Sequence, residues 1–166
     1  MYEHLLVALD GSPAAEQVLE HAEAIATAFR SSITLLRASI SAEMLLAETA
    51  GTGQTVGDLG PALDPTPIVE EDQEDAVEYL ERVAVRLRQH NVTVSVEHPE
   101  GPPDEAIVER ARALNVSLIL MTTHGRSGLG RVVFGSTADA VVRHAACPVL
   151  LVRVRDTDER DRAATT

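Results

Sequence analysis

The stretch Leu5-Leu6-Val7-Ala8-Leu9-Asp10-Gly11-Ser12-Pro13 decides the fold of this 166-residue chain. Its five consecutive apolar residues predict a strand that is buried on both faces. The following Asp10-Gly11 pair predicts a turn, and Ser12 before Pro13 is typical of a helix start, with the serine hydroxyl as the cap. A buried strand that leads through a turn into a helix indicates an α/β domain.

Strand and helix patterns alternate along the rest of the chain. Short apolar runs predict further strands, and apolar residues at three- and four-residue spacing predict helices. The strands are expected at 33–36, 92–96, 117–121 and 148–152, and the helices at 14–29, 76–87, 104–114 and 137–145. This order predicts one doubly wound α/β domain over residues 1–154, with a five-stranded parallel sheet and helices on both faces. The polar tail 155–166 is expected to be disordered.

The connection from residue 41 to 72 differs from the others. Four glycines and three prolines follow a short helix expected at 42–49. Ordinary loops have about 4–6 residues, and much longer ones usually carry a function or move. We therefore expect 41–72 to be a long, mobile connection.

The composition excludes several classes of partner. The chain has 26 acidic and 14 basic residues, a net charge of −12, which argues against nucleic acid and anionic membranes. No apolar run approaches the roughly 20 residues of a membrane span. The lone cysteine, Cys147, fits a reducing compartment. We expect a cytoplasmic protein.

Every basic residue is an arginine, and the chain contains no lysine. The segment 130–137 has the G-x4-G-S-T spacing of a phosphate loop, but the lysine that holds the β- and γ-phosphates is absent, which argues against a Walker-type NTPase. His124 has no nucleophile and orienting group evident around it, so a hydrolase that uses His124 and Asp10 is the least favoured class. The protein is not expected to be an enzyme, although a weak ATPase activity stays open.

The glycine-bearing loop 122–137 is the strongest candidate for an anion site. Glycines let backbone N–H groups approach an anion, and the helix that begins near Gly135 adds about half a positive charge. Arg126 and Arg131 can reach a phosphate as charged forks. The alternative is a surface loop whose glycines only satisfy turn geometry, and composition alone leaves both open. This loop and the Asp10 turn both follow strand ends, so they are expected to meet at one crevice.

Three separated motifs resemble the universal stress protein family. The loop reads T-x2-G-x9-G-S from Thr122 through Gly125 to Gly135-Ser136, where the nucleotide-binding members of the family carry G-x2-G-x9-G-[ST]. The opening Val7-Ala8-Leu9-Asp10-Gly11-Ser12 and the downstream Arg143-His144-Ala145-Ala146-Cys147-Pro148-Val149-Leu150-Leu151-Val152 also look typical of it. The resemblance covers nearly the whole chain.

The resemblance implies the strand order 3-2-1-4-5, a homodimer and a stress-response regulator that binds ATP or AMP with little or no hydrolysis. Asp10 would lie near the adenine and ribose, the backbone of Ala38 would face the adenine, and Gly135 would bind phosphate oxygens. The expected nucleotide-binding residues are Leu9, Asp10, Gly11, Ala38, Thr122, Gly125, Arg126, Ser127, Gly128, Arg131, Gly135, Ser136 and Thr137.

Two of these residues have competing interpretations. Asp10 either contacts the nucleotide or its Mg²⁺, which prefers carboxylate and phosphate oxygens, or accepts backbone hydrogen bonds within the turn. Thr122 replaces the first glycine of the motif, and a β-branched residue does not readily take a positive φ. Thr122 therefore weakens or merely adjusts nucleotide binding. If it abolishes binding, the alternative function is a nucleotide-free dimeric interaction module.

The last strand supplies the expected dimer contact. In the implied order it lies at the edge of the sheet, and an exposed apolar edge favours aggregation. Pairing of Pro148–Val154 with the same strand of a second copy would cover it through a two-fold contact. The alternative is that the tail 155–166 covers the edge, but this tail is polar.

Overall fold

The computed structural model describes residues 1–51, 64–123 and 135–154. Its five strands form one parallel sheet in the order β3-β2-β1-β4-β5, which confirms the expected fold class and strand order. The strands are β1 (His4–Ala8), β2 (Ser32–Leu36), β3 (Thr93–Glu97), β4 (Leu118–Thr123) and β5 (Val149–Arg153).

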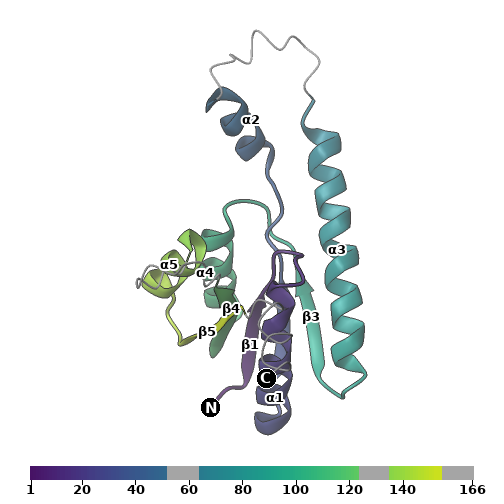
Figure 1. Cartoon of the computed structure of the whole chain (residues 1–166), viewed down its shortest axis with the longest axis vertical. Coiled ribbons are helices and arrows are strands. Elements are labelled where there is room, and N and C mark those ends of the chain that lie inside the picture. Colours follow the sequence, from purple (N-terminus) through teal and green to yellow (C-terminus); the bar gives the residue numbers. More distant parts are fainter. Residues whose placement is uncertain (52–63, 124–134, 155–166) are drawn as a thin grey trace, which may run out of the picture.

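Helices cover both faces of this sheet (Figure 1). One layer contains α1 and α3, and the opposite layer contains α4 and α5. The helical elements are the 3₁₀ helix η1 (Ala15–Val18), α1 (Leu19–Phe29), α2 (Ala42–Gly51), α3 (Thr66–Arg88), α4 (Pro103–Ala113) and α5 (Ser136–His144).

The central strand β1 is deeply buried in the core. Leu5 and Val7 point into the layer of α1 and α3, whereas Leu6 and Ala8 point into the layer of α4 and α5, since successive side chains of a strand alternate between faces. Leu5, Leu6 and Val7 have no exposed surface. The expectation of a strand buried on both faces is confirmed.

The turn after β1 enters the helix as its sequence suggests. The hydroxyl of Ser12 accepts a hydrogen bond from the backbone N–H of Ala15 at 3.1 Å, and its carbonyl accepts one from Glu16 at 3.3 Å. The expected helix at 14–29 begins as η1 and continues as α1, because the first turn of a helix often tightens to 3₁₀ geometry.

The connection 41–72 is helical in two parts. It contains α2 and the first residues of α3, while residues 52–63 lie outside the described part. The helix α3 starts at Thr66, well before Ala76, where the apolar periodicity begins. Its first turns project beyond the carboxyl ends of the strands (Figure 1), so they lack the apolar face on which a sequence prediction depends. Mobility of this connection stays a prediction.

Candidate functional site

A pocket with a volume of about 300 Å³ opens at the carboxyl ends of β1 and β4. This is the point where the strand order reverses, because β2 lies on one side of β1 and β4 on the other. Open α/β sheets bind ligands at such switch points. The residues that line the pocket are Ala8, Leu9, Asp10, Ala15, Pro103, Ile107, Met121, Thr122, Gly135, Ser136, Thr137 and Ala138.

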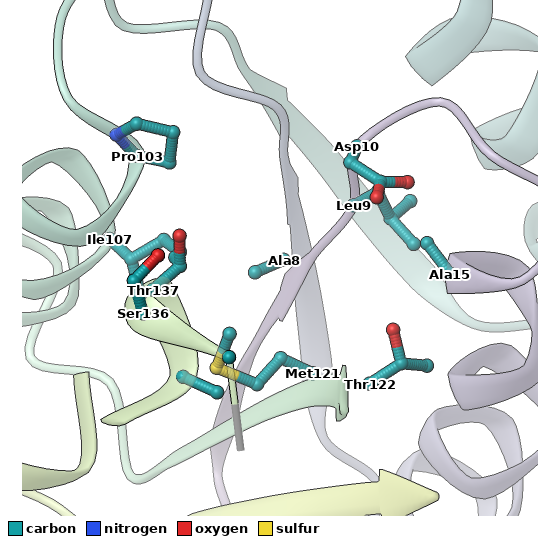
Figure 2. A pocket seen from close by; sticks show the side chains of 12 residues that line it. Ala8, Leu9, Asp10, Ala15, Pro103, Ile107, Met121, Thr122, Ser136 and Thr137 are labelled. Carbon is teal, nitrogen blue, oxygen red and sulfur yellow. The ribbon is translucent and has the colours of Figure 1, made fainter. Parts of the chain in front are cut away.

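The floor of the pocket is apolar and its rim is polar. Ala8, Ile107 and Met121 are at most 8% exposed. Figure 2 shows Ser136 and Thr137 on one side of Ala8 and Asp10 on the other. An apolar floor between a few polar groups suits a ligand with a flat apolar body and polar ends.

The N-terminus of α5 forms one side of the rim. Gly135 precedes the helix with φ 77° and ψ 151°, a conformation that is almost confined to glycine. A Cβ at this position would meet no atom of the described residues within 4 Å, so the backbone conformation and not space requires glycine. The first N–H groups of a helix have no partner within it, and Ser136 and Thr137 add hydroxyls. This side of the pocket therefore offers hydrogen-bond donors of the kind that bind anions.

Asp10 forms the other side of the rim. Its carboxylate accepts a hydrogen bond from the backbone N–H of Ser12 at 2.9 Å, and the same side chain lines the pocket. Asp10 therefore both accepts a hydrogen bond within the turn and lines the pocket, so its two expected roles do not exclude each other. Gly11 follows with φ 85° and lines an adjoining pocket that also includes Asp10 and Arg37.

The expected site residues divide into three groups. The pocket brings together Leu9, Asp10, Thr122, Gly135, Ser136 and Thr137. Gly11 and Ala38 do not line it; Ala38 follows β2 and is half-buried. Gly125, Arg126, Ser127, Gly128 and Arg131, as well as His124, lie outside the described residues.

Thr122 lies inside β4, where it pairs with Val152 of β5. Its backbone has no positive φ, so the strain expected from a β-branched residue at a glycine position does not arise. The backbone here is ordinary strand, and Thr122 differs from glycine only in its side chain; the residue itself lines the pocket.

The pocket also contains apolar residues that the sequence did not single out. Pro103 and Ile107 belong to the first turns of α4, which begins at Pro103, and Met121 belongs to β4. The sequence signals that could have indicated them are the end of the expected strand at Met121 and the start of the helix at Pro103. The apolar pattern by itself predicts burial and does not predict which buried side chains border a pocket.

Within the described residues, no group of three or more His, Cys, Asp and Glu side chains could hold a metal ion. His4 instead bonds the hydroxyl of Thr34 at 2.8 Å and the carbonyl of Leu114 at 3.2 Å. Over the same residues, no helix is long and apolar enough to cross a membrane.

Comparison with known proteins gives one consistent family. The sequence model of the universal stress protein family matches residues 1–153. Universal stress protein MJ0531 of Methanocaldococcus jannaschii is 29% identical over 92% of this chain and 83% of its own length. The solved structure of MJ0577 from the same organism is 25% identical and has a TM-score of 0.72, covering 95% of this chain and 99% of that one.

Two more distant structures share the fold and hold nucleotides. A universal stress protein in complex with cAMP has a TM-score of 0.64 at 19% identity, covering 93% of this chain and 98% of that one. A family protein from Arabidopsis thaliana with AMP bound has a TM-score of 0.59 at 18% identity, covering 95% and 94%.

Proposed function

The chain belongs to the universal stress protein family, and we propose that it is a stress-response regulator that binds an adenine nucleotide between β1 and β4. The observation that carries this proposal is the pocket itself, in which the N-terminus of α5 and the Asp10 carboxylate flank an apolar floor. The family consists generally of regulators without enzymatic activity. The cAMP and AMP complexes of two structural neighbours support an adenine nucleotide as the ligand.

The charges of the pocket suggest how the nucleotide lies. Phosphate oxygens suit the N-terminus of α5, where backbone N–H groups and the hydroxyls of Ser136 and Thr137 can donate hydrogen bonds. The nucleoside suits the floor and the Asp10 side, since a carboxylate accepts hydrogen bonds from ribose hydroxyls or from the adenine amino group. This orientation agrees with the expected roles of Asp10 and Gly135.

We propose ATP, with Mg²⁺, as the ligand, and AMP as the alternative. Mg²⁺ is commonly held by one or two carboxylates together with phosphate oxygens, and Asp10 is a carboxylate that lines the pocket. Little or no hydrolysis is expected, because the chain has no lysine to stabilise charge on the γ-phosphate. The proposed location is the cytoplasm.

A nucleotide-free interaction module is the second candidate. Thr122 favours it, since this residue lines the pocket where the nucleotide-binding members of the family carry the first glycine of the motif. The two candidates are separated by denaturing the purified protein, analysing the supernatant for adenine nucleotide, and titrating the stripped protein with ATP, AMP and cAMP by calorimetry. Binding of none of these ligands would favour the interaction module.

The variant Ser136→Asp tests the orientation. A carboxylate at the first residue of α5 stabilises the helix by about 0.3–1 kcal/mol, yet it repels phosphate, so we expect ATP binding to fall by about 100-fold or more in a folded protein. Thr66→Asp is the matched control, because Thr66 is the first residue of α3 and does not line the pocket. ATP binding that survives in Ser136→Asp would contradict the assignment of the phosphate end.

We further propose a homodimer through Pro148–Val154. β5 is an edge strand, and the backbone carbonyl of Pro148 accepts a hydrogen bond from Ile119 of β4 at 3.0 Å. Neighbouring residues of a strand direct their backbone groups to opposite edges. The backbone groups of Val149 and Leu151 therefore face the outer edge.

This alternation gives a specific test of the dimer. Leu151→Pro removes an outward N–H and leaves the ladder between β4 and β5 intact, so sedimentation is expected to show a monomer. Leu151→Ala is the control, since it shortens the same side chain and keeps the N–H. If Leu151→Pro sediments as the wild type does, pairing through β5 is wrong.

A further inference from the structure

A partly buried ion pair lies behind the Asp10 turn. Arg37, which follows β2, donates from Nη2 to Oδ1 of Asp72 in α3 at 2.8 Å, and the two side chains are 19% and 16% exposed. The second carboxylate oxygen of Asp72 accepts the backbone N–H of Ile40 at 2.8 Å. Both oxygens of Asp72 are thus used to tie the chain after β2 to the beginning of α3.

The guanidinium of Arg37 also lies near the turn, within reach of a side chain placed on Gly11. A Cβ placed on Gly11 would be 3.8 Å from Nε and 3.9 Å from Cζ of Arg37, which is ordinary van der Waals contact. The adjoining pocket of about 330 Å³ is lined by Asp10, Gly11 and Arg37 together. Arg37 is therefore close enough to support the turn, and it does so from outside the lining of the nucleotide pocket.

The shape of the turn between Asp10 and Ser12 sets the position of the Asp10 carboxylate. The carboxylate of Asp10 accepts the N–H of Ser12 at 2.9 Å, across Gly11 with its φ of 85°. A shift of Gly11 would therefore move both ends of this hydrogen bond, and with them the carboxylate that faces the ligand. Among the described residues that line the nucleotide pocket none is basic, and Arg37 is the cation that borders the turn on the side of the adjoining pocket, where its charge is paired with Asp72.

We propose that Arg37, held by Asp72, is a positioning residue for the nucleotide pocket. It fixes the Asp10–Ser12 turn in the shape that presents Asp10 to the ligand, and it couples ligand binding to the first turns of α3. This inference rests on the proposed nucleotide binding. Because coupling between two sites is reciprocal, bound nucleotide in turn stabilises the contact between Arg37 and Asp72.

The first experiment measures nucleotide affinity by calorimetry in matched variants. Arg37→Ala and Asp72→Ala are expected to weaken ATP binding by about 10-fold, and the double variant by no more than either single one, since both remove the same interaction. Arg37→Lys keeps the charge and is expected to restore most of the affinity. Arg82→Ala is the control, because Arg82 lines the same adjoining pocket but is 62% exposed and lies 3.9 Å from its partner Glu78.

The second experiment needs no variant. Hydrogen exchange of the wild-type protein is compared with and without ATP, and amides at 66–75 of α3 are expected to be protected, while those at 81–88 change less. A purely structural ion pair would not produce this ligand-dependent protection. The measurement also covers the case in which Arg37→Ala does not fold.

The outcomes separate this inference from the proposal on which it rests. If wild type binds ATP but Arg37→Ala and Asp72→Ala bind it equally well, or if ATP leaves exchange at 66–75 unchanged, the positioning role is wrong and nucleotide binding stands. If wild type binds no ATP, AMP or cAMP, the proposed function is wrong and this inference with it.

Discussion

Two turns at the carboxyl end of the sheet form opposite walls of the pocket, and they are built differently. Each has a glycine with positive φ, Gly11 at 85° and Gly135 at 77°. Gly11 is in contact range of Arg37, whereas a side chain at Gly135 would meet no described atom within 4 Å. In the proposal above Arg37 braces the β1 turn, and the α5 turn borders the pocket with the N-terminus of its helix. We therefore expect the first wall to be set by the protein and the second to depend more on the bound ligand.

The largest effect is expected at the α5 wall. Gly135→Ala forces a side chain into a conformation almost confined to glycine, at a cost of about 1–3 kcal/mol, and it turns the N–H groups of α5 away from the phosphate. We expect ATP affinity to fall by at least about 10-fold and adenosine affinity to change little, both measured by calorimetry.

Gly11→Ala is the matched change at the braced wall. It also strains a positive φ, but it acts on the nucleoside end, so ATP and adenosine are expected to weaken equally. If Gly135→Ala also weakens ATP and adenosine binding equally, the two walls do not differ in the part of the ligand that they bind.

A smaller effect is expected at Thr122, which lies between the walls. Because its backbone is regular strand, Thr122→Gly should lower the free energy of unfolding by about 0.5–1 kcal/mol. The removed side chain opens the pocket, so ATP binding should tighten by less than about 10-fold. Thr122→Ser, which keeps the hydroxyl and removes the methyl group, shows which part of the side chain matters. Unchanged affinity in both variants would show that the side chain is neutral.

The smallest effect at neutral pH is expected for Tyr79→Phe, behind the braced wall. Burial, followed by the charges of Glu16 and Asp10, raises the pKa of Tyr79 to about 12. Its hydroxyl is buried and has no hydrogen-bond partner in the described part of the chain, so its removal should change stability little at pH 7.

The difference between wild type and Tyr79→Phe should appear at high pH. The folded phenol binds its proton more tightly than the unfolded one, whose pKa is about 10. The contribution of the Tyr79 phenol to the free energy of unfolding is therefore fully present below pH 10 and is lost as the pH rises from 10 towards 12. Urea unfolding across this range should show a decline in wild type that is weaker in Tyr79→Phe. Parallel curves would contradict the assignment.

How far the sequence predicts this molecule depends on the range of the interaction concerned. The apolar run of β1 and the cap at Ser12 are local patterns, and both are present in the structure. The contact between Arg37 and Asp72 joins residues 35 positions apart through side chains, which no local pattern reports. Ile107 is similar, because its periodicity predicts burial but not the pocket that it borders.

The early start of α3 at Thr66 is a second feature that local sequence patterns do not predict. Residues 66–75 carry several acidic side chains and little apolar periodicity, since this part of the helix does not pack on the sheet. Pro65 and Pro67 also suggest a loop, yet proline is tolerated in the first turn of a helix, where its missing N–H would have no partner. Helical structure without an apolar face leaves a weak signal in the sequence.

The described residues that line the pocket include no basic side chain, and this has a consequence for the speed of association. A nucleotide that approaches this protein meets a net charge of −12, and within the described lining only backbone dipoles and hydroxyls attract it at short range. The long-range field therefore repels the ligand that the pocket would retain. Added salt screens this repulsion, so ATP should arrive faster as ionic strength rises, opposite to the behaviour of an enzyme that steers its anionic substrate.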